Sequence, residues 1–417
     1  MGGRGWFVPA FYAGFAIAAG LLLPRLESRL LPGLAAAMSV SAAMAIYSSI
    51  ASGMIALTGI VFSLVFVMVQ FSATAYSPRL VAWVARSPLI AHALGIFTAT
   101  FLYAISALAW VDRRGTNTVP LMSGALVLLL LVASVGMLIG LIDRIGFLAV
   151  NRMLSFTGDQ GRAVIESAYA DRIDGARPIA SVTPRAPLTQ TIVYRGHPLA
   201  VQAVDVEALV KHARRADAFI EVVATVGDTV SASAPLLRVF GGARPLSEHT
   251  LRRAVKLGRD RTFEQDPKYA IRLLVDIAIR ALSPAVNDPT TAVQALDQIG
   301  DLLIRLAPRQ LEAGAYRDHD GVLRLVVRLP AWEDFLRLAF DEIRTYGAGS
   351  VQVMRRMKAL VSDLAADVPA DRRDAVVAWQ NRLDRTIART FADVEDQREA
   401  SVEDQQGLGV PRARPAA

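Results

Sequence analysis

The chain has 417 residues, of which 53% are hydrophobic, with no cysteine and a formal net charge of +7. The lack of cysteine excludes disulfide bonds, thiolate nucleophiles and cysteine-based metal sites. The basic balance does not indicate nucleic-acid binding, because much of the excess arginine lies at the ends of apolar segments, where arginine anchors a membrane span.

Four long apolar runs occupy the first third of the chain, at Trp6–Leu23, Ile50–Phe71, Leu89–Val111 and Val119–Ile142. Each has about the 17–25 residues that a helix needs to cross the hydrocarbon core of a bilayer. A lipid-facing strand or loop would leave backbone groups unpaired at that depth, so helix is favoured. Residues 1–150 are therefore predicted to form a four-helix transmembrane domain, with membrane lipid as its partner.

The arginines around these runs predict an orientation. An even number of spans puts both termini on one side, and that side carries Arg4, Arg79, Arg86, Arg144, Arg152 and Arg162. The other side carries Arg25, Arg29, Arg113 and Arg114, partly offset by Glu27 and Asp112. The positive-inside bias then favours a multi-pass protein of the cell inner (plasma) membrane with both termini in the cytoplasm.

Small and polar residues form a stripe along the second span and its upstream extension, from Ser41 to Thr74. They fall mainly at steps of three, four and seven, close to the period of a straight helix. The candidate pore-lining members are Ser48, Ser52, Gly59, Ser63, Gln70 and Thr74. Two interpretations stand, namely close helix–helix packing in lipid and a water-lined path at the axis of an oligomer.

The fourth span contains Gly136 and Gly140 in a G-x-x-x-G pattern. This pattern favours close helix packing, which we expect within the four-helix unit. No ionisable residue lies in the middle of a predicted span, which argues against a proton-relay pump.

After the last span the sequence changes character. Residues 151–188 are predicted as a helix and a linker rich in Pro, Ala and Ser. Residues 189–245 alternate β-prone runs with turns and predict a small β-rich module. The phrase Ala224–Leu236 is similar to the barrel-sandwich hairpin of biotinyl and lipoyl carrier domains, where Gly-Asp makes the turn. The modified lysine of those domains is missing, so no carrier role and no cofactor are expected.

Residues 246–400 are predicted to form a mainly helical soluble domain. The helical periodicity covers Glu248–Gly258, Pro267–Leu282, Pro289–Leu306, Trp332–Tyr346, Val351–Ala366 and Asp371–Glu399. Val322–Leu329 is a lone strand candidate, and residues 401–417 are predicted as a disordered tail. The predicted fold class is thus an α-helical membrane domain plus a soluble α+β part.

The most polar stretch of the soluble part, Arg259–Asp288, holds a candidate motif. Its residues are Arg261, Glu264, Asp266, Asp276, Arg280, Ser283, Asn287 and Asp288. Asp288 is placed to cap the helix that follows it, and Asp276 and Arg280 are spaced to pair along a helix. Carboxylates can bind a hard cation. Helix capping and ion pairing explain the carboxylates of this motif more simply, so no metal is predicted.

Catalytic signatures are missing from the sequence. It contains no H-E-x-x-H, no G-x-S-x-G, no P-loop and no G-x-G-x-x-G on a strand-to-helix turn. We therefore do not expect an enzyme.

Three segments resemble a known family, the DUF2254 family of predicted bacterial membrane proteins. They are residues 61–80 at the end of the second span, residues 201–210, and residues 261–292 with the phrases "Arg-Thr-Phe-Glu-Gln-Asp-Pro" and "Ala-Leu-Ser-Pro-Ala-Val-Asn-Asp-Pro-Thr-Thr-Ala". The resemblance spans roughly residues 1–400 and implies an N-terminal membrane domain, a soluble C-terminal domain and no established activity. Ala285 departs from the glycine expected in relatives.

The favoured function is an oligomeric channel or permeation-type protein that passes ions or small solutes. Four spans are few for a self-contained transporter, no inverted repeat is visible, and a small bundle needs symmetric copies to enclose a path. The second span would line the axis of a homo-oligomer, and the soluble part would form a cytoplasmic assembly collar. The alternative is a membrane-anchored sensor or scaffold that binds a protein or small ligand at the turn Ser283–Asp288.

Overall fold

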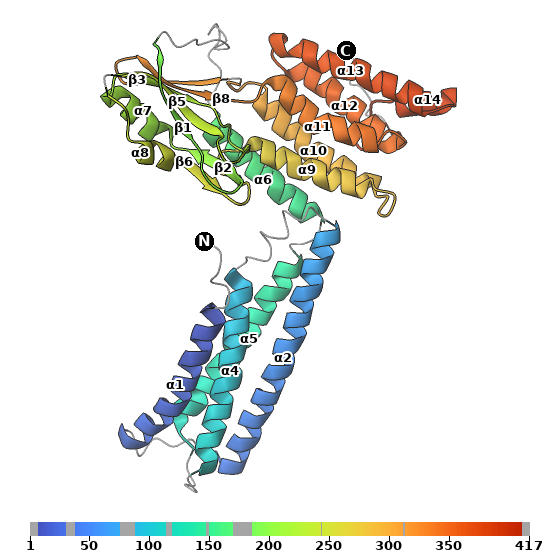
Figure 1. Ribbon diagram of the computed structural model, residues 1–417. Coiled ribbons are helices and arrows are strands. Elements are labelled where there is room, and N and C mark those ends of the chain that lie inside the picture. Colours follow the sequence, from blue (N-terminus) through green and yellow to red (C-terminus); the bar gives the residue numbers. More distant parts are fainter. Residues whose placement is uncertain are drawn as a thin grey trace. The chain divides into compact units, whose positions relative to one another are not determined.

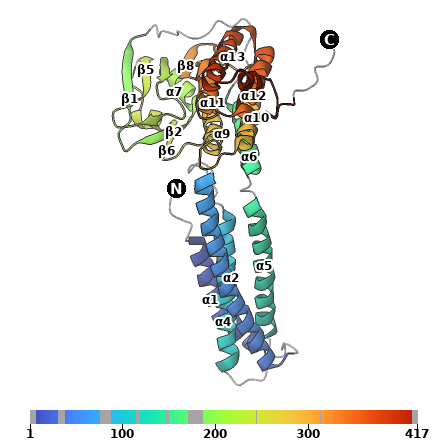
Figure 2. The same ribbon diagram turned by 90° about the vertical axis from the view of Figure 1, so that its right-hand side faces the viewer.

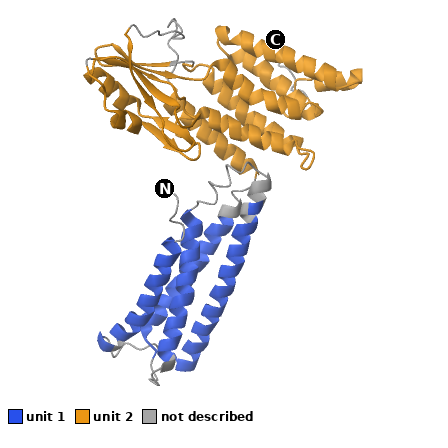
Figure 3. Cartoon of the chain, viewed as in Figure 1, with its two compact units in different colours: residues 1–149 blue, residues 150–417 orange. Residues whose placement is uncertain are grey.

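The computed structural model describes residues 7–30, 38–75, 88–113, 119–146, 150–169, 186–242, 244–311 and 313–410. The chain divides into two compact units, residues 1–149 and residues 150–417 (Figure 3). The predicted linker before residue 188 lies largely outside the described residues.

Four described helices of the first unit are long and apolar enough to cross a membrane (Figure 1). They are α1 (Phe7–Leu30), α2 (Val40–Ala75), α4 (Pro88–Arg113) and α5 (Leu121–Gly146). A helix pairs its backbone groups internally, which suits these apolar sequences to lipid. The predicted four-helix membrane domain is confirmed. Helix α2 is continuous over 36 residues, about 54 Å at 1.5 Å per residue.

Helix α4 is the central helix of this unit, because it packs against α1, α2 and α5. In α4, 44% of the apolar span is buried, against 17% in each of the other three helices. Its Gly95 allows a close approach of α1, since a Cβ there would lie 2.6 Å from Tyr12 Cδ2. The core between the helices is built from Ala16, Ala43, Tyr47, Ala99, Tyr103, Ala107, Val111, Val119 and Val127.

The second unit contains two β-sheets. The five-stranded sheet has the order β1-β5-β3-β8-β7, in which β3 and β8 are parallel and the other neighbours antiparallel. Its strands are β1 (Leu188–Val193), β3 (Ala218–Val222), β5 (Pro235–Gly241), β7 (Ala313–Arg317) and β8 (Leu323–Arg328). The antiparallel three-stranded sheet consists of β4 (Thr229–Val230), β2 (Leu199–Val204) and β6 (Val255–Gly258). Inward-facing apolar side chains of both sheets, such as Ile192, Val201, Ile220 and Leu325, share one core.

Helices make up the rest of this unit, which begins with α6 (Val150–Ala168). Two short helices, α7 (Val206–Arg215) and α8 (Glu248–Arg253), lie beside the strands (Figure 1). The remaining helices gather on the other side of the unit (Figure 2): α9 (Pro267–Ala281), α10 (Pro289–Leu306), α11 (Trp332–Tyr346), α12 (Val351–Asp367), α13 (Ala370–Thr390) and α14 (Val394–Ala400).

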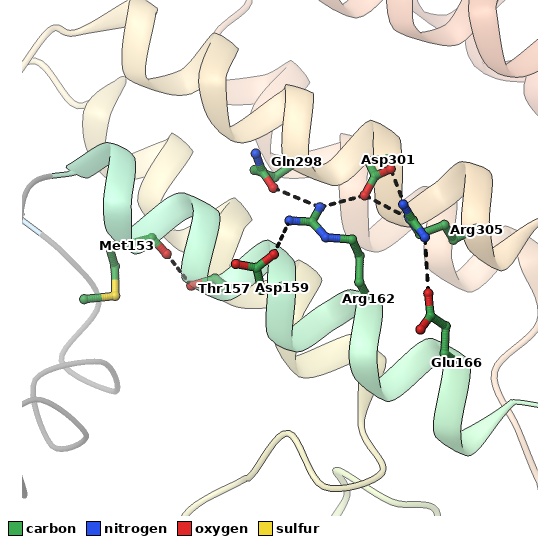
Figure 4. Close-up of polar contacts among 8 residues, drawn as sticks. All are labelled: Met153, Thr157, Asp159, Arg162, Glu166, Gln298, Asp301 and Arg305. Atoms are coloured by element: carbon green, nitrogen blue, oxygen red, sulfur yellow. Dashed lines mark hydrogen bonds and ion pairs between the residues drawn. The ribbon is translucent and has the colours of Figure 1, made fainter. Parts of the chain in front are cut away.

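Hydrogen bonds and ion pairs join the polar side chains of α6 to those of α10 (Figure 4), and we call this set of contacts the polar seam. Arg162 donates to Asp301 at 2.7 Å and to Gln298 at 3.3 Å, and it also pairs with Asp159 on its own helix. Arg305 joins Asp301 to Glu166. The seam makes α6 part of the soluble unit.

The β-rich part extends beyond the predicted range 189–245. Strand β8 is not a lone strand, because it pairs with β7 and, in parallel, with β3. The two strands after the turn at Gly227 do not pair with each other as in a carrier hairpin. Instead β4 joins β2, while β5 lies between β1 and β3. The sequence pattern could not show these pairings, because they connect residues far apart in the chain.

Two helical predictions are corrected by the structure. The predicted helix Glu248–Gly258 ends at Arg253, and Val255–Gly258 instead pairs with β2. The predicted helix Asp371–Glu399 is broken at Phe391, after which Asp393 caps α14.

The predicted disordered tail is also corrected for residues 401–410. Asp404 is buried there, and its carboxylate accepts hydrogen bonds from the backbone N–H of Gln406, Gly409 and Val410. Burial raises the pKa of Asp404, but these backbone donors outweigh it and the net pKa is lowered. Residues 411–417 lie outside the described residues.

Candidate functional site

Helix α2 meets the rest of its unit along one face only. The residues buried on this face are Ala43, Tyr47, Ala51, Met54 and Val61. Helix α2 packs chiefly against α4. The predicted small-residue stripe lies on the opposite face, where Ser48, Ser52, Gly59 and Ser63 are all exposed. A Cβ placed on Gly59 would have no neighbouring atom within 4 Å. The stripe is therefore uncovered in a single copy of the chain.

The other two predicted stripe residues lie at the end of α2. Gln70 is exposed. Thr74 belongs to the described helix, but its side chain lies outside the described residues. The stripe of described side chains therefore runs from Ser48 to Gln70.

Hydroxyl groups of the membrane unit fall into two groups. Some donate to the carbonyl four residues earlier, as Thr58 does to Met54 at 2.7 Å and Ser134 to Leu130 at 2.8 Å. Ser48, Ser52 and Ser63 have no hydrogen-bond partner among the described residues. The uncovered face of α2 therefore carries hydroxyls that have no partner within the described part of one copy.

The two glycines of the G-x-x-x-G pattern in α5 differ in their surroundings within one copy. Gly136 is exposed, and a Cβ there would meet nothing within 4 Å. A Cβ on Gly140 would make only ordinary contact with Leu89 at 3.9 Å. The helix packing expected of Gly136 and Gly140 stays a prediction.

Buried polar groups inside the membrane unit are joined to one another across helices. Thr100 and Ser134 lie 2.9 Å apart between their hydroxyl oxygens, as do Tyr103 and Ser123. Glu27, at the end of the first span, is also buried. From the sequence, Glu27 is counted among the charged residues at the membrane surface. No local sequence pattern indicates that its side chain is buried.

In the soluble unit, Arg261 and Asp266 form the centre of the predicted motif. Asp266 caps α9 by accepting from Tyr269 N at 3.1 Å, and it accepts from Arg261 at 2.7 Å. Burial raises the pKa of the Asp266 carboxyl, and the neighbouring Arg261 opposes that rise. Glu264 is exposed and pairs with Lys256. Glu264 thus binds Lys256 of β6, while Asp266 fixes the start of α9.

Further along α9, Asp276 accepts from Arg272 at 2.7 Å, and Arg272 also pairs with Glu342 of α11. The Glu342 pKa is lowered, chiefly by its hydrogen bond to Arg272. The predicted pairing of Asp276 with Arg280 stays a prediction.

The turn between α9 and α10 is held by backbone hydrogen bonds and leaves its tip exposed. Asn287 N donates to Ser283 O at 2.9 Å, and Asn287 has a left-handed φ of 50°. Asp288 caps α10 through Thr291 N at 3.1 Å, as predicted from the sequence. Val286 is 51% exposed at the tip. This tip makes no contribution to the core of its own unit.

The carboxylates of the motif thus act separately, as helix caps or as members of ion pairs. Among the described residues, no group of three or more His, Asp or Glu side chains is arranged to hold a metal ion. The two candidate regions that remain are the outer face of α2 and the turn at residues 283–288.

Comparison with known proteins gives a family match. The model of the DUF2254 family, described as "Predicted membrane protein", matches residues 3–363. Uncharacterized proteins of Mycobacterium tuberculosis and Mycobacterium bovis are 28% identical to this chain over 407 residues, which covers 94% of this chain and 78% of each of theirs. No solved structure matches the chain. The family match takes in all four membrane helices and the soluble unit into α12.

Proposed function

Because the chain belongs to the DUF2254 family of predicted membrane proteins, we propose that it assembles into an oligomeric channel or permeation-type protein for ions or small solutes. Helix α2 of each copy lines the axis, and the soluble unit forms an assembly collar. In this proposal the protein resides in the cell inner (plasma) membrane with both termini in the cytoplasm, and it has no catalytic role.

The observation that carries this proposal is the outer face of α2. It presents small side chains and the unpartnered hydroxyls of Ser48, Ser52 and Ser63 away from α4. Small residues let helices of neighbouring copies approach closely. Hydroxyls that face a shared aqueous axis would be hydrated. They would thus avoid the desolvation cost that a hydroxyl incurs in lipid.

The interior of one protomer offers little support for a path of its own. Its buried polar side chains Thr100, Ser134, Tyr103 and Ser123 are paired with one another, and α4 fills the centre of the unit. A path between copies is therefore the more economical arrangement, as is usual for small bundles with closed symmetry.

A single-cysteine scan tests the proposal, because the natural chain has no cysteine. In vesicles, a water-soluble thiol reagent should modify Ser52→Cys and Ser63→Cys and block solute flux. The matched controls are Met54→Cys, whose position is buried against α4, and Ile139→Cys, whose position is exposed on α5. Modification of the α2 face no faster than of Ile139→Cys, or a monomer by native mass measurement, would contradict it.

A second candidate function is a membrane-anchored sensor or scaffold that binds a protein or small ligand through the soluble unit. The observation that favours it is the exposed tip of the α9–α10 turn, where Val286 and Asn287 face outward without packing in their own unit. Affinity purification of the full chain with Asn287→Ala and Val286→Ser distinguishes the two functions. Loss of a bound partner with the oligomer and flux unchanged would favour the scaffold.

A further inference from the structure

Glu27 is a buried acid in the membrane unit that binds the first turn of another helix. Only 5% of the residue is exposed. Its Oε1 accepts a hydrogen bond from Met122 N at 2.8 Å, and its Oε2 accepts one from Ser123 N at 3.1 Å. The end of α1 is thereby tied to the start of α5.

These two amides are the second and third of α5, which begins at Leu121. They are the amides that a local N-cap side chain normally satisfies. The residue before α5 is Pro120, which has no polar side chain. Glu27 therefore supplies from α1 the acceptor that the local sequence lacks, and its charge is stabilised by the positive end of the helix dipole.

A second observation at the same place is the hydroxyl of Tyr47 on α2. Tyr47 is 2% exposed, and its hydroxyl has no hydrogen-bond partner among the described residues. It points at the first turn of α5, because a Cβ on Gly124 would lie 3.2 Å from it.

Polar groups of the four described membrane helices lie near Glu27. From α2 the facing group is Tyr47, and from α4 it is Tyr103, whose hydroxyl bonds to Ser123 of α5. Helix α5 contributes the amides and the Ser123 hydroxyl. On α1 itself, Arg25 and Arg29 lie two residues to either side in sequence, and Arg25 lies over the ring of Trp110.

We propose that Glu27 is a proton-binding site that sets the contact between α1 and α5. The ionised carboxylate accepts from both amides and keeps the helices joined. When an aqueous proton binds to one carboxylate oxygen, that oxygen becomes an O–H donor and no longer accepts from its amide. The start of α5 then keeps only one of its two hydrogen bonds to Glu27 and loses the attraction of the carboxylate charge, so acidification loosens this end of the bundle.

Hydrogen exchange of the full chain in nanodiscs, followed by mass spectrometry, tests the proposal without a flux assay. Exchange of the segment 121–126 is compared at about pH 7 and in acid at about pH 4, after correction for intrinsic rates. The natural chain should lose protection about tenfold on acidification, the size of effect expected of a charged hydrogen bond. Glu27→Gln should be poorly protected at both values.

Two further variants separate the proton site from a merely structural cap. Pro120→Asp combined with Glu27→Gln supplies a local cap, so protection at about pH 7 should return. Asp143→Asn, at the exposed opposite end of α5, should behave as the natural chain. Protection of the natural chain that does not change between the two pH values would overturn the proposal. So would an acid-dependent loss that persists in Glu27→Gln.

Discussion

The guanidinium of Arg261 donates from both Nε and Nη2, at 2.9 and 2.7 Å, to the same oxygen of Asp266. Asp266 also caps α9, and Gly227 of the β-turn lies against the pair, since a Cβ there would be 2.8 Å from Arg261 Nη2. Gly227 has a φ of +91°, which favours glycine. One ion pair therefore joins the β-turn, the polar motif and the start of α9.

Replacing Asp266 with Asn should destabilise the soluble unit. The variant leaves Arg261 without its buried counter-charge, and removal of one partner of such a pair costs about 3 kcal/mol. Thermal unfolding of the full chain in detergent, followed by circular dichroism, measures the loss. The control is Glu264→Gln, since Glu264 is exposed and its pairing with Lys256 is worth about 1 kcal/mol or less. Equal effects of the two variants would contradict this role of Asp266.

The same motif shows what can be predicted from local sequence. The Asp288-Pro289 pair predicts the start of α10, and Asp288 does cap it. Apolar length and composition predict the four membrane helices, and the small-residue period predicts the unbroken α2. These features depend on residues within a few turns of one another, so they can be read from the order of residues alone.

Long-range pairing explains what the local pattern misses. The apolar residues of Val255–Gly258 also fit a helix. In the structure this segment is a strand, because its backbone pairs with β2. Strand β8 is placed by β3, about a hundred residues away. Glu27 is buried because α5 lacks a local cap, and the α1 sequence contains no sign of that. The outward direction of the α2 stripe likewise depends on which face α4 covers.

Acid should weaken the link between α9 and α11. Arg272 donates to both oxygens of Glu342, at 2.6 and 2.8 Å, and lowers the Glu342 pKa below its usual value. A folded-state pKa below the unfolded one gives stability that is present above the unfolded pKa and is lost as pH falls through the folded one. The Tm difference between the natural chain and Glu342→Gln should therefore shrink between about pH 6 and about pH 3. A difference that is constant over this range would refute the link.

The chain end at residues 401–410 should be released when Asp404 loses its charge. Its lowered pKa arises because backbone donors outweigh the effect of burial, so attachment is present at neutral pH and is lost only well into acid. Asp404→Asn lacks the charge at every pH and should expose this segment to limited proteolysis at neutral pH. Asp396→Asn, on the exposed surface of α14, is the control. Unchanged cleavage of Asp404→Asn would show that other contacts suffice.

Two glycine-to-alanine changes should have opposite effects. A Cβ on Gly161 of α6 would lie 2.7 Å from Leu302 Cδ1 and 3.1 Å from Ala270 Cβ, so Gly161→Ala should cost about 1–3 kcal/mol by overpacking. A Cβ on Gly136 would meet nothing within 4 Å, so Gly136→Ala should gain about 0.5 kcal/mol or more of helix stability. Thermal unfolding compares the two. Loss of stability in Gly136→Ala would instead indicate that another copy packs against this face of α5.

A bulky side chain on the stripe of α2 should close the proposed path. In Ser63→Trp the indole would project from the uncovered face of α2 into the axis, and flux through reconstituted vesicles should fall about tenfold or more. Gln70→Ala removes a polar amide from the same face and should lower flux less. Ile139→Trp adds the same bulk to the exposed face of α5 and should leave flux unchanged. Because Ser63 faces outward, Ser63→Trp should still fold, and native mass measurement should find the same oligomer. If Ser63→Trp and Ile139→Trp conduct equally well, α2 does not line the path.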